Sequence, residues 1–222
     1  MKFDVVVPTY QRVEKLEKFL SSVKKQNNPN FHVYCYFDNN DSNGYEKFKD
    51  SDGVTCFLLH DRKRAFGVWN HHLKTMDADA LLYVCDDIEF YDGCFEEIEK
   101  IFMRDGLIGF NQANIPSGEG FSRFAMGCIG AGFADLFPNR QCFCPDFLSF
   151  HADSELGQVA IRKNKFIYGE NCKIHHHHPA HEKKEWDDTH NVVRDSVPYD
   201  RETYNLRRAK DILWGLSFER VR

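Results

Sequence analysis

Leu81-Leu82-Tyr83-Val84-Cys85-Asp86-Asp87-Ile88-Glu89-Phe90 is the stretch on which the fold prediction rests. It is an apolar run that ends in two adjacent carboxylates, with a third acid two positions later. Such a run, rich in strand-forming residues, predicts a buried strand that delivers acids to its carboxyl end, where open α/β sheets bind ligands. Adjacent carboxylates repel each other, so the pair is unfavourable unless a cation or hydrogen-bond donors lie between them. The alternative is a solvated acidic turn after a core strand, and the stretch by itself leaves both open.

The composition predicts one globular domain. The chain has 222 residues, of which 42% are hydrophobic, and a net charge of −5, which gives no general attraction to nucleic acid or anionic membranes. No apolar run approaches the roughly 20 residues of a membrane span. The start, Met1-Lys2-Phe3-Asp4, lacks the apolar stretch of a signal peptide. We therefore expect a cytoplasmic protein with no membrane partner.

The eight cysteines lie mostly inside apolar segments, and no CxxC pair occurs. This pattern is typical of reduced cysteines in a core. Cys142-x-Cys144 is the one spacing that could belong to a zinc site, although a second pair is missing.

Strands and helices alternate through the first half of the chain. Besides the quoted strand, we expect strands at 3–7, 31–37 and 54–59, and helices at 13–25, 68–76 and 94–104. This alternation is typical of a mostly parallel sheet with helices on both faces. The strand exits fall on one edge of such a sheet and carry polar residues, namely Thr9, Asp38, His60 with Asp61, and Asp86 with Asp87.

The second half has a different pattern. Residues 106–150 are rich in Gly and aromatic residues, which favours a mixed sheet with loops. We expect a helix at 152–163, strands at 166–168 and up to Ile174, a charged segment, and a last helix from about Arg201 with Asp200 as its N-cap. Without internal repeats or linkers, we predict a single domain: a nucleotide-binding half at 1–105, an acceptor and catalytic half at 106–178, and a C-terminal loop and helix at 179–222.

From about Val5 to His178, the chain resembles the family 2 glycosyltransferases of the GT-A fold. Each motif that carries the resemblance is weak alone, and their order makes it specific. The motifs are Val5-Val6-Val7-Pro8-Thr9-Tyr10-Gln11-Arg12, Asp38, Arg64-Ala65-Phe66-Gly67-Val68-Trp69-Asn70, Cys85-Asp86-Asp87, Asp153-Ser154-Glu155-Leu156 and His176-x-His178. The resemblance implies an α/β GT-A fold with a mostly parallel central sheet, helices on both faces and a smaller mixed-sheet acceptor half.

The resemblance also implies an activity and a set of site residues. It implies an inverting transferase that moves a hexose or pentose from a nucleotide-sugar donor, most often a UDP-sugar, to an acceptor hydroxyl. Asp87 would bind Mn²⁺ or Mg²⁺ with His176 and His178, and Glu89 is an alternate ligand if the strand continues. Asp153 would be the catalytic base with Glu155 as runner-up, because Ala152 replaces a Glu that is frequent in the family. The implied nucleotide-binding residues are Pro8, Thr9, Tyr10, Arg12, Asp38, Arg64, Asn70 and Asp86.

These residue types suit that chemistry. A nucleoside diphosphate leaving group gains charge as the sugar departs, and a divalent cation that bridges its phosphates stabilises the charge. Mg²⁺ and Mn²⁺ favour oxygen ligands, and Mn²⁺ also accepts imidazole. In an inverting displacement, a base removes the proton of the acceptor hydroxyl.

Four successive histidines precede Pro179. On an extended segment, His176 and His178 would lie on one face and His175 and His177 on the other. His181 and His190 are expected to be solvated. Further positions stay open: Lys183, Lys184, Arg207 and Arg208 are either diphosphate ligands or solvated charges, and Gly130-Ala131-Gly132 lies either beside the acceptor or where backbones pack closely.

Two alternative functions remain at this stage. A nucleotidyltransferase of related fold would carry a Gly-rich basic loop after the first strand, but residues 8–12 contain no Gly. A non-catalytic module that binds nucleotide-sugar or metal is the other alternative. The acceptor is left open among a glycan, a protein, a small molecule and a modified DNA base.

Overall fold

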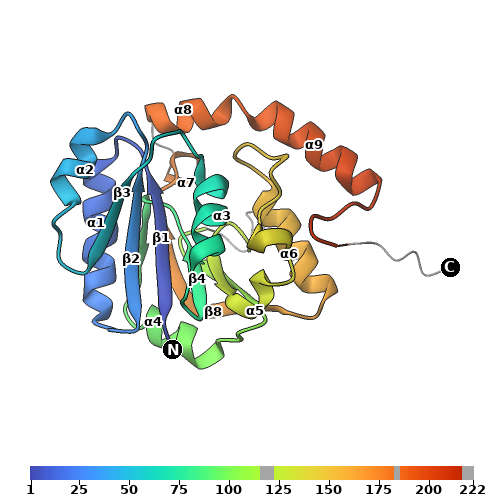
Figure 1. The fold of residues 1–222 in the computed structure, drawn as a ribbon, viewed down its shortest axis with the longest axis horizontal. Coiled ribbons are helices and arrows are strands. Elements are labelled where there is room, and N and C mark those ends of the chain that lie inside the picture. The colour runs from blue at the N-terminus through green and yellow to red at the C-terminus, as the bar shows by residue number, and fades with distance from the viewer. Residues whose placement is uncertain (116–122, 183–185, 217–222) are drawn as a thin grey trace.

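The computed structural model describes residues 1–115, 123–182 and 186–216, which are organised around one eight-stranded sheet (Figure 1). The strand order is β3-β2-β1-β4-β7-β6-β8-β5. Strands β1 to β4 are mutually parallel, with bounds Phe3–Thr9, Phe31–Phe37, Val54–Leu58 and Ala80–Tyr83. The mixed part contains β5 (Ile88–Phe90), β6 (Leu107–Gln112), β7 (Gly127–Gly130) and β8 (Phe166–His176). Strand β7 is antiparallel to β4 and β6, β8 is parallel to β6, and β5 is antiparallel to β8.

Helices cover both faces of the sheet, which confirms the predicted α/β fold class. Helices α1 (Val13–Gln26) and α4 (Cys94–Ile101) contribute apolar side chains to the core on one face, and α3 (Ala65–Thr75) and α6 (Ala152–Arg162) to the core on the other. The remaining helices are α2 (Ser42–Phe48), α5 (Ala131–Ala134), the 3₁₀ turn η1 (Pro138–Arg140), α7 (Pro179–Glu182), α8 (Asp188–Arg194) and α9 (Val197–Ala209).

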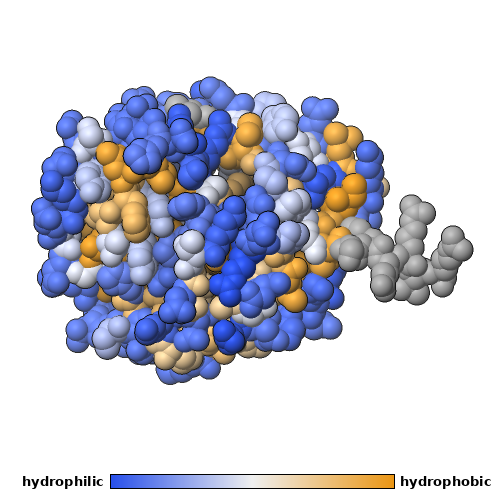
Figure 2. Space-filling view, viewed as in Figure 1, coloured by the Kyte–Doolittle hydropathy of each residue, from blue (hydrophilic) through white to orange (hydrophobic). Residues whose placement is uncertain are grey.

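The surface agrees with a core of this kind. Hydrophilic residues predominate on the face shown in Figure 2, and apolar ones form small separate groups. Within the described ranges, no helix combines the length and apolar character that a membrane crossing requires.

The quoted run 81–90 forms two strands, whereas the sequence predicted one. Strand β4 ends at Tyr83 inside the sheet, and β5 begins at Ile88 at its far edge. Asp86 and Asp87 therefore lie in the link between two strands. Glu89 was expected to share a face with Asp87 only if the strand continued, and this condition is not met, because β4 ends at Tyr83 and β5 begins at Ile88.

Several other boundaries differ from the prediction. Helix α3 begins three residues earlier, at Ala65, and the two short strands expected after residue 165 form the single strand β8. Helix α2 was not predicted; its N-cap Asp41 accepts a hydrogen bond from the N–H of Gly44 at 3.1 Å. Cys142 and Cys144 are buried in an apolar core, which argues against the zinc alternative.

Gly130 permits close packing of two backbones. A Cβ atom at this position would lie 2.2 Å from the carbonyl oxygen of Arg104, where no side chain fits. The packing explanation of the Gly130-Ala131-Gly132 segment is therefore sufficient.

The sequence predicted that Asp200 caps the last helix, but it does not. Helix α9 begins at Val197, and the fully buried carboxylate of Asp200 accepts hydrogen bonds from the N–H groups of Leu148, Ser149 and Phe150, each at 2.8 Å. Three donors on one carboxylate fix the loop 148–150 against α9. This matters for the site, because Ser149 and Phe150 line its cavity.

Asp200→Asn should lower the free energy of unfolding by about 2 kcal/mol, because an amide NH₂ replaces an acceptor that faces buried N–H donors. Urea unfolding followed by circular dichroism measures this change. Glu202→Gln is the matched control, since Glu202 is exposed on the same helix. Equal stability of the two variants would show that Asp200 does not hold the loop.

Candidate active site

Asp86 and Asp87 are both buried at the exit of β4, with exposed fractions of 3% and 4%. The hydroxyl of Thr9, at the end of β1, donates to Asp86 Oδ2 at 2.8 Å, and Arg12 Nη1 donates to Asp86 Oδ1 at 3.0 Å. The same Nη1 lies 3.5 Å from Asp87 Oδ2. The structure thus supplies the cation and donors that an adjacent acid pair requires, and a solvated acidic turn is excluded.

Two histidines flank Asp87 on its two oxygens. His176 Nε2, from β8, lies 3.5 Å from Asp87 Oδ1, and His190 Nε2, from α8, lies 3.3 Å from Oδ2. His176 is held from behind by Gln112, whose side-chain oxygen lies 2.7 Å from Nδ1. The ring of His178 is 5.3 Å from that of His176 and 4.9 Å from that of His190. The carboxylate of Asp87 therefore lies in one cluster with the rings of His176, His178 and His190.

The pKa values of the two acids are shifted in opposite directions. Burial raises the pKa of Asp86, and Arg12 offsets this effect only in part. Burial also acts to raise the pKa of Asp87, but the hydrogen bonds to His176 and His190 outweigh it and hold the pKa of Asp87 well below its usual range. Asp87 is therefore the acid that stays ionised and is available to a cation.

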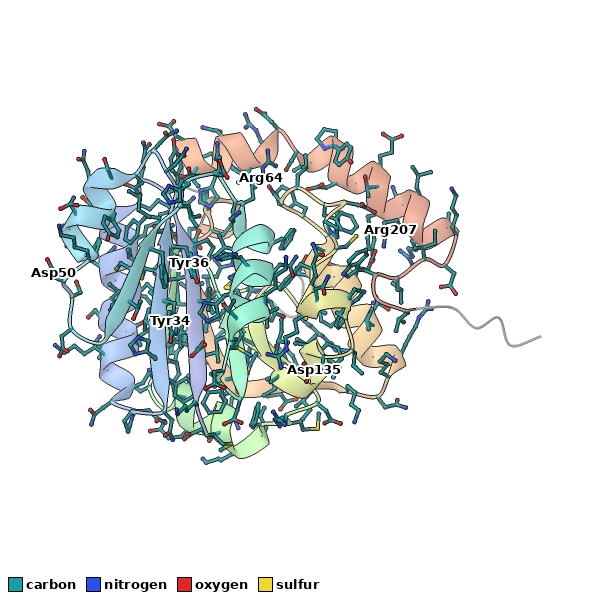
Figure 3. All side chains as sticks on the ribbon, viewed as in Figure 1. Tyr34, Tyr36, Asp50, Arg64, Asp135 and Arg207 are labelled. Carbon is teal, nitrogen blue, oxygen red and sulfur yellow. The ribbon has the colours of Figure 1, made fainter. Side chains whose placement is uncertain are left out.

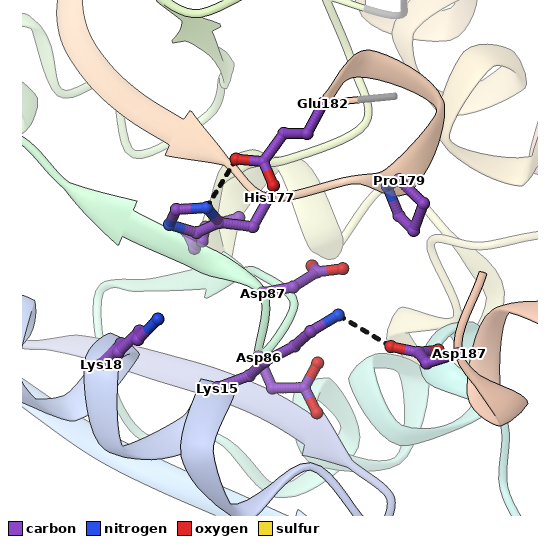
Figure 4. Close-up of a pocket in the computed structure, with 9 residues that line it drawn as sticks. Lys15, Lys18, Asp86, Asp87, His177, Pro179, Glu182 and Asp187 are labelled. Carbon is purple, nitrogen blue, oxygen red and sulfur yellow. Dashed lines mark hydrogen bonds and ion pairs between the residues drawn. The ribbon is translucent and has the colours of Figure 1, made fainter. Parts of the chain in front are cut away.

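Arg12 connects this pair to the C-terminal segment. Its Nη2 donates to Asp187 Oδ1 at 2.8 Å, and Asp187 also accepts from Lys15 at 2.8 Å (Figure 4). Asp187 Oδ1 lies 2.7 Å from His190 Nδ1, so it orients the imidazole beside Asp87. The first loop and α8 are thus joined through one guanidinium.

A cavity of about 250 Å³ opens at this edge of the sheet, below α8. Tyr36 and Arg64, labelled in Figure 3, are among the residues that line it. Most of the side chains predicted for the site line it, namely Pro8, Thr9, Tyr10, Arg12, Asp38, Arg64, Asp86, Asp87, His176 and His178.

Asp38 presents an open acceptor in this cavity. Its Oδ2 is 3.2 Å from Nε of Arg62, whereas its buried Oδ1 has no hydrogen-bond partner among the described residues. Arg62 also lies over the ring of Tyr10, 5.1 Å from its centroid. A buried carboxylate oxygen without a donor is costly.

Asn70 does not belong to the site, contrary to the prediction. It is buried in α3, where its Nδ2 donates to the carbonyl of Phe143 at 2.7 Å and its Oδ1 accepts from the N–H of Phe143 at 2.9 Å. Because both ends of the amide are used, Asn70 fixes the loop at 143 and offers nothing to a nucleotide.

Asp153 and Glu155 lie in the first turn of α6 but have different surroundings. Burial and then the charge of Asp153 raise the pKa of Tyr83, the last residue of β4, but neither Asp153 nor Glu155 lines the cavity at Asp38 and Asp87. Glu155 is buried against Arg207, which donates to its two oxygens at 2.7 and 2.8 Å, and it also accepts from the N–H of Trp214. Arg207, a candidate diphosphate ligand, is engaged there, and Lys183 and Lys184 lie outside the described residues, as does the side chain of His181.

The sequence did not point to the segment 186–193 as part of the site. His190, which we expected to be solvated, is buried beside Asp87, and Trp186, Thr189 and Val193 line the same cavity. The one available signal was Asp187, which is followed three residues later by His190 and caps α8 by accepting from its N–H at 2.9 Å. The other site residues of this segment could not be recognised from the sequence, because charged residues dominate its composition.

Comparison with protein families gives a match between residues 4–157 and the model of glycosyl transferase family 2. The chain belongs to this family. Membership favours glycosyl transfer over the nucleotidyltransferase alternative. No curated protein sequence matches the chain.

Solved glycosyltransferase structures share the fold. S. aureus TarS 1-349 in complex with UDP-GlcNAc is 18% identical, with a TM-score of 0.57 over 76% of this chain and 56% of that one. The mannosyltransferase PcManGT from Pyrobaculum calidifontis, in complex with GDP-Man and Mn²⁺, is 12% identical, with a TM-score of 0.58 over 78% of this chain and 56% of that one. This family 2 chain therefore spans less than two thirds of the length of either neighbour.

Arg12→Met should lower the free energy of unfolding by about 3 kcal/mol, because it leaves buried carboxylates without their counter-charge. Lys15→Met is the matched control, since Lys15 contacts the partly exposed Asp187 and should cost less than about 1 kcal/mol. Chemical denaturation in metal-free buffer compares the two variants. If Arg12→Met costs no more than Lys15→Met, Arg12 does not support the acid pair.

Proposed function

We propose that this family 2 glycosyltransferase moves a sugar from a nucleoside diphosphate donor to an acceptor hydroxyl, with inversion and with the help of one divalent metal ion. The observation that carries the proposal is that one cavity contains an open carboxylate oxygen on Asp38, a group of arginines, and the ionised Asp87 with its histidines. Asp38 would recognise the base of such a donor, the arginines its diphosphate, and Asp87 with the histidines the metal ion.

Asp38 would recognise the base of the nucleotide. Its open Oδ1 can accept the ring N–H of uracil or of guanine, and the related solved structures carry UDP-GlcNAc and GDP-Man. We favour UDP, as the sequence resemblance implies. Arg62 and Arg64, which also line the cavity, suit the charge of a diphosphate.

The residues around Asp87 fit a divalent ion. A carboxylate with imidazoles suits Mn²⁺, and Mg²⁺ would rely more on Asp87 and on donor oxygens. Asp87, His176 and His178 would hold the ion, and the placement of His190 adds a further candidate. When bound, the ion neutralises the charge that develops on the leaving diphosphate. Arg12 and Thr9 hold Asp86 beside it, which orients the second acid without using it as a ligand.

Asp153 is the better choice for the base that accepts the proton of the acceptor hydroxyl. Glu155, the runner-up, is engaged by Arg207 and by the N–H of Trp214. A carboxylate that serves as the partner of a buried guanidinium cannot take up a proton without breaking that pair. Asp153 is half-buried, and its charge contributes to the raised pKa of Tyr83, the last residue of β4.

Asp87→Asn should abolish the Mn²⁺-dependent part of donor binding, because the amide removes the ionised ligand. Calorimetric titration with UDP-sugars and GDP-sugars, with and without Mn²⁺, measures this effect. Asp135→Asn is the control, since Asp135 is an exposed acid far from the cavity (Figure 3). Donor affinity and transfer that are unchanged by excess chelator would contradict the metal role.

Asp153→Asn should reduce kcat by at least about 100-fold while the Kd of the donor stays within about twofold, because a base acts on the acceptor and not on the donor. Release of nucleoside diphosphate in the presence of an acceptor pool gives kcat. Ser154→Ala, at the adjacent position, is the control. If donor binds but no acceptor pool supports turnover by the unaltered protein, the chain is a non-catalytic binding module.

A further inference from the structure

A second group of histidines and acids lies on the opposite face of the β5–β8 edge from His176. His175 precedes the last residue of β8, His177 directly follows the strand, and Glu89 of β5 is the cross-strand partner of His175. Glu182, the last residue of α7, lies at the same face. None of these residues lines the cavity that contains Asp38 and His190, but His177 and Glu182 line a second pocket to which Asp86 and Asp87 also contribute.

Ring nitrogens of both histidines point at the same carboxylate oxygen. His175 Nε2 lies 3.1 Å and His177 Nδ1 lies 2.8 Å from Glu182 Oε1. The candidate ligand atoms of these three residues all lie within 4.8 Å of one another, and the two rings are 4.2 Å apart. Ligands at about 2.0–2.1 Å from a tetrahedral ion are roughly 3.3 Å apart, so small side-chain shifts would admit one ion.

Glu89 occupies the place of an outer carboxylate. Its Oε1 lies 2.7 Å from Nε2 of His177, the ring nitrogen that faces away from Glu182. Histidines that bind metals commonly donate their second N–H to a carboxylate, which fixes the tautomer and makes the other nitrogen a better ligand. A histidine that lies between two carboxylates in this way is therefore arranged for a metal on its Nδ1 side.

We propose that His175, His177 and Glu182 bind one Zn²⁺ ion and that Glu89 orients His177. Two imidazoles and one carboxylate are a typical zinc ligand set with one open position. His177 and Glu182 line a pocket of about 250 Å³, which Asp86 and Asp87 also line, so water can complete the coordination (Figure 4). The nitrogen-rich set favours zinc over Mg²⁺, which requires oxygen ligands.

The ion would act as a cross-link rather than as a catalyst. Helix α7 connects β8 to the segment 186–193, which covers the cavity and supplies His190 to Asp87. An ion held by Glu182, by His175 of β8 and by His177, which follows β8, would fix the start of this segment to the sheet. The N–H of His177 also donates to the carbonyl of Asp87 at 2.8 Å, so the two metal sites share a backbone contact but no ligand.

Zinc titration in an Asp87→Asn background tests the proposal, because this change removes the ionised ligand of the other site. Calorimetry with metal-stripped protein and ZnCl₂, in the presence of a competing chelator, should give one equivalent of bound Zn²⁺. His175→Gln and Glu182→Gln should each weaken binding by more than about tenfold, and Glu89→Gln by about 10-fold. His71→Gln, which removes an exposed histidine from α3, should leave the affinity unchanged.

A spectroscopic readout separates a built site from scattered ligands. Co²⁺ added to the Asp87→Asn protein should give the intense visible absorption of four-coordinate cobalt, and this absorption should be lost in His175→Gln and in Glu182→Gln. Circular dichroism in chelator shows that each variant is folded, and a variant that fails to fold is replaced by the other. Equal zinc affinity in all variants, or loss of all zinc binding on Asp87→Asn alone, would overturn the proposal. Donor binding does not enter the readout, so the result is independent of the proposed transfer activity.

Discussion

The pairing of Arg12 with Asp86 and Asp87 is the interaction on which the site depends. Two buried carboxylates next to each other in the chain are tolerated only because a guanidinium, a hydroxyl and two imidazoles face them. Those groups come from the ends of β1 and β8 and from α8, which are far apart in the sequence. The electrostatic requirement of one dipeptide thus determines where three segments meet.

The same requirement gives the two acids different partners. Asp86 is the partner of Arg12 and Thr9, whereas Asp87 is flanked by histidines and stays ionised. A divalent ion at Asp87 would lie beside a guanidinium, so part of the attraction to the ion is offset by repulsion from Arg12. Asp187 accepts hydrogen bonds from Arg12 and Lys15, and its negative charge partly offsets the positive charge of Arg12. The affinity for metal therefore depends on α8 as well as on the strand exit.

The strands and the acid pair could be predicted from the sequence because buried strands leave apolar runs, as at 31–37, whose predicted bounds match β2. The link between β4 and β5 could not, since periodicity does not show where a chain leaves a sheet. The identity of a side chain also leaves its partner open: Asn70 and Asp200 suit a ligand or a cap, but each satisfies buried backbone groups elsewhere in the chain. His190 was hidden by charged neighbours, and only the docking of α8 brings it to Asp87.

Register explains how one run of histidines serves two faces. Cys172, Ile174 and His176 point into the molecule at alternate positions of β8, while Lys173 and His175 point outward. A slip of one residue would bury Lys173 in the apolar core, at a cost far above that of any lost contact at the edge. Burial of Ile174 therefore decides that His176 faces Asp87 and that His175 faces Glu182. The cation expected at Asp87 and the one proposed at Glu182 would therefore have different ligands, although Asp87, His177 and Glu182 line one pocket.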